Sequence, residues 1–254
     1  MNQAPGDRSG LDSRLGIGAV AQSRAYRRPW LALAIAGIAV AATLVVILIL
    51  PAIHERLSSV PGWVVRMTDL VVLSAPLLLG VGLAGMLAAD GIRRATGIRR
   101  WRWTDAALGV CVGLITRALT ELVAPTAGRL LGPFDVELTA DVLVGAAVLV
   151  AGVVLITPVV EELFFRGVIV RALSDALTGA GRAIAGTVAV AVSTAVFVML
   201  HIAPSGAGVP LGVVVGTSAV GVGCGILTLV TGRLGGAIVA HVAFNAIGVA
   251  LLLW

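Results

Sequence analysis

The stretch VLVGAAVLVAGVVLITPVVEELFFR, residues 142–166, decides the class of fold because it is an apolar run that contains two acids and an arginine towards its end. A transmembrane helix needs about 20 predominantly apolar residues, and this run supplies them. An ionisable side chain at bilayer depth costs about 2.5 kcal/mol or more on insertion scales, so it usually faces the interior of the protein and serves a function. Glu161, Glu162 and Arg166 are therefore the first candidate site residues.

The composition of the whole chain also favours a membrane protein. Of its 254 residues, 59% are hydrophobic and 12% are charged, and the mean hydropathy is +1.06. A soluble core of this size could not hide so many apolar side chains. The net charge is +5, and all 18 basic residues are arginines that gather mainly beside apolar segments. This pattern is typical of membrane topology, so we expect membrane lipid around the chain and no nucleic-acid partner.

Seven apolar segments are long enough to cross a bilayer. They lie at residues 30–50, 67–89, 104–124, 142–164, 184–203, 210–231 and 234–254. The sequence therefore predicts an all-α fold, a polytopic membrane helix bundle of seven transmembrane helices with eight as the alternative, in a single domain over residues 26–254. Residues 1–25 are predicted to be a flexible cytoplasmic tail. Arginines before the first span and after the second outnumber those of the intervening loop, which predicts a cytoplasmic N-terminus.

Spacing separates the roles of the two adjacent acids. Glu162 and Arg166 lie four residues apart and share one face of a helix, so the guanidinium neutralises this carboxylate. Glu161 points elsewhere and stays free to act as a general base. The alternative interpretation is a charge cluster at a helix end, with Arg166 extending to the membrane surface.

Two further histidines also lie in apolar segments. His201 and Glu161 are at similar distances from a turn predicted near Gly179–Gly181, so they would meet across a helical hairpin. His241 and Asn245 are one turn apart on the same face of the last span. A lone histidine in such a helix is more often a packing residue or an interhelical hydrogen-bond donor. A cavity with a carboxylate, two imidazoles and an amide nevertheless holds the groups that peptide hydrolysis needs.

The predicted spans place His201 and His241 at different depths in the membrane, which conflicts with a shared site. A straight sixth helix over residues 210–231 would place His201 and His241 too far apart along the bundle to share one water molecule. We therefore expect a helix to bend, tilt or start late. Gly206, Gly208 and Pro210 indicate a long loop after His201, which would shorten the sixth span.

Three motifs follow one another in order: Glu-Glu-x-x-x-Arg at 161–166, Phe-x-x-x-His at 197–201 and His-x-x-x-Asn at 241–245. Over roughly residues 140–254, which would be its protease-like core, the chain resembles the CAAX prenyl protease and bacteriocin-processing (CPBP, ABI) family of intramembrane proteases. The resemblance implies that Glu161 activates the attacking water and that Glu162 and Arg166 shape the site. It implies that His201 holds the water or a metal, and that His241 and Asn245 steady the oxyanion or complete the coordination.

The resemblance leaves the cofactor open. Family members are described as metalloproteases, and a metal-free glutamate mechanism has also been argued. A divalent metal such as zinc would take Glu161, His201 and His241 as ligands with a water in the fourth position. The chain lacks His-Glu-x-x-His, so the zincin helix is absent.

The resemblance also implies an integral membrane endopeptidase of the bacterial plasma membrane, with access from the cytoplasmic side. Its substrate would be a membrane-associated or lipidated peptide or protein. One alternative is a non-catalytic membrane scaffold or bacteriocin-immunity protein on the same fold. A second is an ion transporter, which the lack of a visible inverted repeat disfavours.

Overall fold

The computed structural model describes residues 24–126, 139–206 and 208–253, and the named elements in these ranges are all helices. They are α2 (Pro29–Arg56), α3 (Gly62–Gly85), α4 (Ile92–Ala95), α5 (Trp103–Val123), α6 (Ala140–Ala151), η1 (Gly152–Ile156), α7 (Thr157–Phe164), η2 (Phe165–Val170), α8 (Arg171–Ala176), η3 (Thr178–Ala180), α9 (Arg182–Ile202), η4 (Ala203–Ser205), α10 (Leu211–Thr231) and α11 (Gly235–Leu253). Apart from Arg24 and Ala25, the predicted tail over residues 1–25 lies outside the described residues.

Within the described ranges, seven helical segments are long and apolar enough to cross a membrane, which confirms the predicted polytopic helix bundle. The fourth is one continuous segment, Ala140–Ala176, built from α6, η1, α7, η2 and α8. Large apolar side chains such as Leu48 and Val230 stay 78% and 79% exposed on the outside of the bundle. These side chains would face lipid, and the chain is an integral multi-pass membrane protein.

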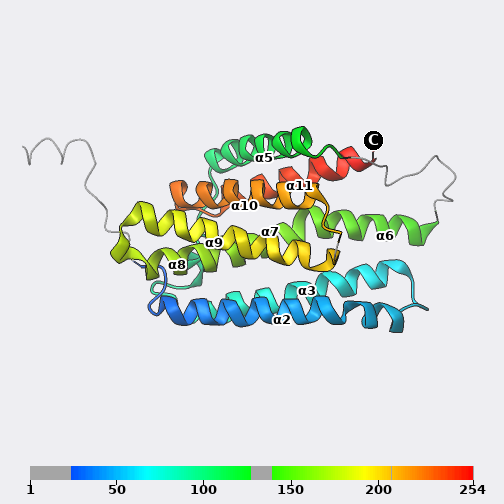
Figure 1. Cartoon of the computed structure of the whole chain (residues 1–254), viewed down its shortest axis with the longest axis horizontal. Coiled ribbons are helices and arrows are strands. Elements are labelled where there is room, and N and C mark those ends of the chain that lie inside the picture. The colour runs from blue at the N-terminus through cyan, green and yellow to red at the C-terminus, as the bar shows by residue number, and fades with distance from the viewer. Residues whose placement is uncertain (1–23, 127–138, 207, 254) are drawn as a thin grey trace, which may run out of the picture.

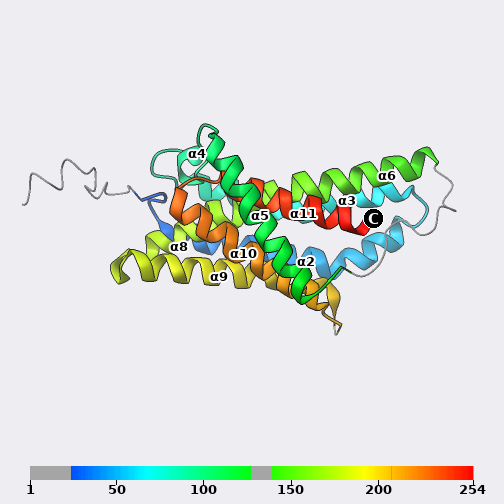
Figure 2. The same ribbon diagram turned by 90° about the horizontal axis from the view of Figure 1, so that it is seen from above.

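The helices pack in layers along the long axis of the molecule (Figure 1). The α2–α3 pair packs against the fourth segment, which packs against α9. Next comes α10, and α5 packs over α10 and α11. Figure 2 shows that α5 and α10 run obliquely to α9. The α7–η2 part of the fourth segment therefore lies inside the bundle with neighbours on several sides, whereas α6 is largely exposed.

Small residues allow a close contact between α5 and α11. A Cβ atom added at Gly109 would lie 2.6 Å from the carbonyl oxygen of Gly236, and one added at Gly113 would lie 2.6 Å from that of Ala240. Glycine at these positions lets two transmembrane backbones touch. Because Ala240 precedes His241, this contact also fixes the position of one candidate site residue.

The substitution Gly113→Ala is expected to lower the unfolding free energy by about 1–3 kcal/mol, because the added methyl group meets a backbone carbonyl and the helices must separate. Thermal unfolding in detergent micelles would measure the effect. Gly82→Ala in α3 is the matched control, since no heavy atom lies within 4 Å of a Cβ there. Equal melting temperatures for the two variants would contradict the prediction.

A buried ion pair joins α5 to the turn between the last two helices. Arg233 Nε lies 2.8 Å from Asp105 Oδ1, and Arg233 Nη2 lies 2.6 Å from Asp105 Oδ2. Gly232 ends α10 in the left-handed conformation, with φ +64°, which directs the chain into this turn. The sequence analysis did not predict this pair, because its residues are 128 positions apart.

The described helices correct three sequence-based boundaries. The first helix continues to Arg56 rather than ending at residue 50, so His54 lies on this helix, and it pairs with Asp69 at 2.7 Å. The fourth helical segment ends at Ala176 rather than at 164. The sixth span is not shortened, because α10 runs from Leu211 to Thr231. The depth conflict is resolved instead by the oblique course of α10 and by the α8–α9 turn, which extends beyond the α10–α11 turn (Figures 1 and 2).

Candidate active site

The two adjacent acids lie on α7, between two π-helical turns. Pro158 has no N–H group, and its ring would collide with a carbonyl of the preceding turn of an α-helix. The wide turn η1 precedes it, with Thr157 N–H donating to Gly152 O, five residues back. In that register the donor to the carbonyl of Val153 would be the N–H of residue 158, which proline lacks. Asn245 Nδ2 donates to Val153 O at 2.8 Å and supplies the missing hydrogen bond.

The second wide turn, η2, is held by side chains from elsewhere in the chain. Ser193 of α9 donates to the carbonyl of Phe165 at 3.2 Å, and the hydroxyl of Tyr26 donates to the carbonyl of Gly167 at 2.8 Å. π-Helical turns are rare and often mark functional sites. Here they fix the direction in which Glu161 and Glu162 point.

Glu162 contacts both Arg166 and His241 inside the core. Its Oε1 lies 2.9 Å from Arg166 Nη1 and 2.9 Å from His241 Nδ1. Glu162 is 0% exposed and Arg166 is 1% exposed. Arg166 also donates through Nη2 to the carbonyls of Val220 and Gly221 in α10, at 3.3 and 3.1 Å. The predicted pairing of Glu162 with Arg166 is therefore present, and Arg166 does not extend to the surface.

Glu161 faces both imidazoles. Its Oε1 lies 3.6 Å from His201 Nε2, and its Oε2 lies 3.7 Å from His241 Nε2. Because a carbonyl only accepts, His201 Nδ1 donates to Phe197 O at 2.8 Å. In a neutral ring this leaves a lone pair on His201 Nε2. His241 Nδ1 is held in the same way by the carboxylate of Glu162. Two acceptor nitrogens thus face a carboxylate at distances that suit a bridging water molecule.

The ring of Phe197 packs among these groups. Its centroid lies 4.3 Å from that of His201, 5.7 Å from that of His241 and 5.0 Å from that of Phe165. The guanidinium carbon of Arg166 lies 5.0 Å from the same centroid. Phe197 therefore orients both imidazoles and contacts the arginine, which gives the aromatic residue of the second motif a physical role.

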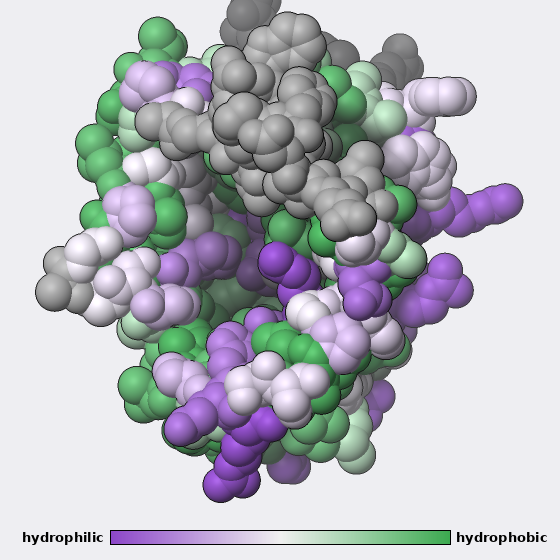
Figure 3. Space-filling view, turned by 90° about the vertical axis from the view of Figure 1, so that its right-hand side faces the viewer, coloured by the Kyte–Doolittle hydropathy of each residue, from purple (hydrophilic) through white to green (hydrophobic). Residues whose placement is uncertain are grey.

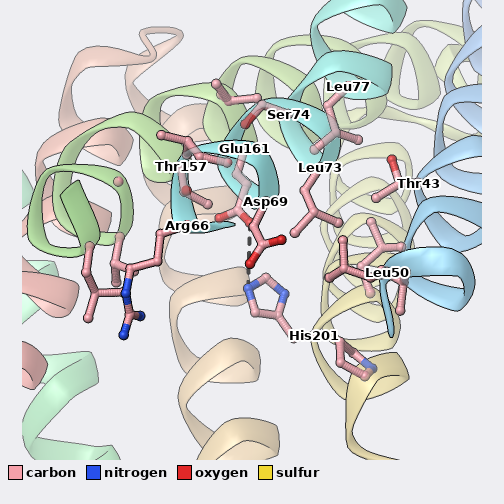
Figure 4. A pocket seen from close by; sticks show the side chains of 18 of the residues that line it. Thr43, Leu50, Arg66, Asp69, Leu73, Ser74, Leu77, Thr157, Glu161 and His201 are labelled. Carbon is pink, nitrogen blue, oxygen red and sulfur yellow. Dashed lines mark ion pairs between the residues drawn. The ribbon is translucent and has the colours of Figure 1, made fainter. Parts of the chain in front are cut away.

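A cavity of about 380 Å³ opens beside Glu161 and His201 (Figure 4). Leucines and other apolar residues form most of its wall, and Arg66, Asp69 and Ser74 of α3 add polar groups. The sequence analysis missed these α3 residues. An acid inside a predicted span, at Asp69, was the signal that could have found them.

The structure brings together most of the predicted site. Glu161, Glu162, Arg166, His201 and His241 form one connected group. Asn245 lies one turn beyond His241, but its amide donates to the backbone of η1. A role of Asn245 at the oxyanion stays a prediction from the resemblance.

The metal ligands that the resemblance implies are one acid and two histidines. Carboxylate oxygen and imidazole nitrogen are donors that zinc takes. Within the part of the chain that the structure describes, however, no group of three or more His, Cys, Asp or Glu side chains could hold a metal ion. Ligation by Glu161, His201 and His241 therefore stays a prediction from the resemblance.

Comparison with known proteins identifies the segment that holds this site. Residues 143–247 match the family model described as type II CAAX prenyl endopeptidase, Rce1-like. No curated protein and no solved structure matches the chain. The matched segment contains all three sequence motifs, which confirms the predicted family for this part of the chain.

Proposed function

We propose, from the premise that residues 143–247 carry a domain of the CAAX prenyl endopeptidase family, that the chain hydrolyses peptide bonds inside the membrane through Glu161. The observation that carries this proposal is the convergence of Glu161, His201 and His241 on one point beside a cavity. These groups come from three different helices, α7, α9 and α11. They therefore meet through the packing of the bundle and not because they are neighbours in the sequence.

Glu161 is the general base of the proposed reaction. It accepts a proton from a water molecule held between its carboxylate and the two imidazoles, and the water oxygen attacks the carbonyl carbon of the substrate. Glu161 suits this role because the guanidinium of Arg166 pairs with Glu162 and not with it. Its carboxylate therefore stays available to the water.

The proton must then reach the leaving amine. His201 is the more exposed of the two imidazoles, and its Nε2 faces both Glu161 and the cavity. In the proposed sequence the proton moves from Glu161 through His201 to the amide nitrogen. The C–N bond of the tetrahedral intermediate breaks, which releases an amine and a carboxylic acid. The acid then gives its remaining proton to solvent and becomes a carboxylate.

The remaining groups act by positioning. Glu162 holds His241 through Nδ1, and Arg166 neutralises Glu162 while it fastens α7 to α10. The apolar wall of the cavity, which includes Leu73 and Leu77, fits an apolar side chain or a lipid chain of a membrane-anchored substrate.

The test is a cleavage assay with the purified protein in liposomes and a library of membrane-anchored, internally quenched peptides. His201→Gln is expected to lower kcat/KM by about 10²-fold, because the proton relay is lost while the helix is kept. Met199→Leu, two residues away on α9, is the matched control and is expected to cleave as the wild type does. Equal cleavage by His201→Gln would contradict the assigned site.

The same preparation distinguishes the competing functions. Peptide binding without turnover by the wild-type protein would favour a scaffold or immunity protein. Ion flux across the liposomes that is lost in His201→Gln would favour a transporter. Either result would overturn the proposed hydrolysis.

A further inference from the structure

The cavity occupies one half of the bundle. On the fourth segment it begins at Val148 and Leu149 and ends at Glu161. At about 1.5 Å per residue, the twelve residues from Leu149 to Glu161 cover roughly 18 Å along the helix. From α3 the cavity takes residues 66–77, in the part where that helix begins. The cavity therefore runs from Glu161 towards the end of the bundle where α3 and α6 begin.

The opposite direction is closed. Beyond Glu161 the fourth segment continues with Glu162, Phe164, Phe165, Arg166 and Val168, and all of them are at most 1% exposed. These side chains fill the interior between α2, α9 and α10. A peptide could not reach Glu161 from that side without opening the core.

The end where α3 and α6 begin is hollowed at the surface. Figure 3 shows this face, and hydrophilic residues gather around its hollow. Arg66 and Asp69, in the first two turns of α3, line the cavity from this end, and Arg66 is exposed. Figure 4 shows Asp69 beside Glu161 and His201, with the Arg66 side chain pointing away from them. The site thus has a polar entrance at this end and an apolar wall inside it.

Exposed arginines gather at the other end of the bundle. They lie before α2, around α4, before α5 and at the start of α9: Arg24, Arg27, Arg28, Arg93, Arg94, Arg99, Arg100, Arg102 and Arg182. Six arginines line a hollow of about 880 Å³ there. At the cavity end, the exposed arginines among the described residues are Arg56 and Arg66. Arginine-rich short loops stay in the cytoplasm, so the cavity end faces the extracytoplasmic side.

We infer that the catalytic cavity opens to the extracytoplasmic side and receives a membrane-anchored peptide whose scissile bond is presented from that side. The peptide substrate in this inference rests on the proposed function. The direction in which the cavity opens does not. It is opposite to the access that the family resemblance implies. A prenylated C-terminus on the cytoplasmic leaflet would face the arginine-rich, closed end of the bundle. A peptide that has been translocated, or that is anchored in the outer leaflet, reaches Glu161 through the cavity.

Cysteine labelling tests the direction of the opening. Ser74→Cys lines the cavity, and Arg93→Cys is exposed at the arginine-rich end. Both are made in a background in which Cys111 and Cys224 are replaced by alanine. With a membrane-impermeant maleimide on sealed right-side-out vesicles, Ser74→Cys is expected to react at least 10-fold faster than Arg93→Cys. Inverted vesicles are expected to reverse the order.

Two results would overturn the inference. Preferential labelling of Arg93→Cys in right-side-out vesicles would reverse the orientation, and labelling of Ser74→Cys from neither side would exclude an open cavity. Arg66→Cys, exposed at the entrance, is the positive control for labelling at this end of the bundle. Labelling does not depend on turnover, so adding Glu161→Gln is expected to leave the labelling pattern unchanged. The experiment therefore tests the orientation of the cavity even if the protease assay shows no cleavage. Where turnover is present, an impermeant anchored peptide added outside right-side-out vesicles is expected to be cleaved without permeabilisation.

Discussion

Glu161→Gln is expected to lower kcat/KM by about 10³- to 10⁴-fold, because glutamine has the shape of glutamate but cannot accept a proton from water. The carboxylate of Glu161 lies 3.6 Å from His201 Nε2 and 3.7 Å from His241 Nε2, so no short direct bond is lost with it. The change should therefore remove activity and leave the folded protein in place. Single-turnover cleavage of an anchored peptide measures the loss, and thermal unfolding checks the fold.

The matched control for this substitution is Glu55→Gln, at the exposed end of α2. It removes one negative charge at the end of the bundle where the cavity opens, and this variant is expected to cleave at the wild-type rate. If Glu161→Gln kept more than a tenth of the wild-type kcat/KM, Glu161 could not be the general base. Loss of activity in both variants would instead indicate an effect of net charge on substrate binding.

Arg166→Met is expected to lower the unfolding free energy by about 3–5 kcal/mol, because it leaves the carboxylate of Glu162 in the core with a hydrogen bond from His241 but without its guanidinium partner. Glu162 is 0% exposed, so water cannot replace the guanidinium. The contacts from Arg166 to the carbonyls of α10 are lost as well. Thermal or chemical unfolding in detergent micelles measures the effect.

A double substitution separates the lost charge from lost packing. Combining Arg166→Met with Glu162→Met removes both charges and is expected to recover part of the stability, since apolar residues of similar volume can replace a buried ion pair. Arg182→Met, at the exposed start of α9, is the matched control and should stay within about 0.5 kcal/mol of the wild type. If Arg166→Met were no less stable than Arg182→Met, the buried pair would not hold the core together.

These two predictions separate the functions of adjacent acids. Glu161 borders the cavity and is expected to affect turnover, whereas Glu162 is enclosed with Arg166 and is expected to affect stability and the position of His241. The direction of each side chain depends on the π-helical turns on either side of α7. Neither turn is predicted by hydropathy, because a wide turn changes hydrogen bonding without changing the apolar pattern.

Several parts of the site were accessible from sequence. The i, i+4 spacing predicted the pairing of Glu162 with Arg166, and the symmetrical distances from the turn near Gly179–Gly181 predicted the meeting of Glu161 with His201. The position of Asp69 was not predicted, because its approach to the site depends on how α3 packs against the fourth segment. The hydrogen bond from Asn245 to Val153 was not predicted either, since it depends on which carbonyl the turn before Pro158 leaves free.

The sequence by itself determined the membrane class, the seven spans, the order of the three motifs and the distribution of arginine between the ends. These features depend on composition and local spacing, because the bilayer requires an apolar run of fixed length and the positive-inside bias acts on short loops. Only the tertiary structure decided that the cavity runs from Glu161 towards the end with few arginines, while buried aromatic and charged side chains close the other end. Access of this kind depends on which helix faces pack together, and apolar helices of similar composition can pack in more than one way.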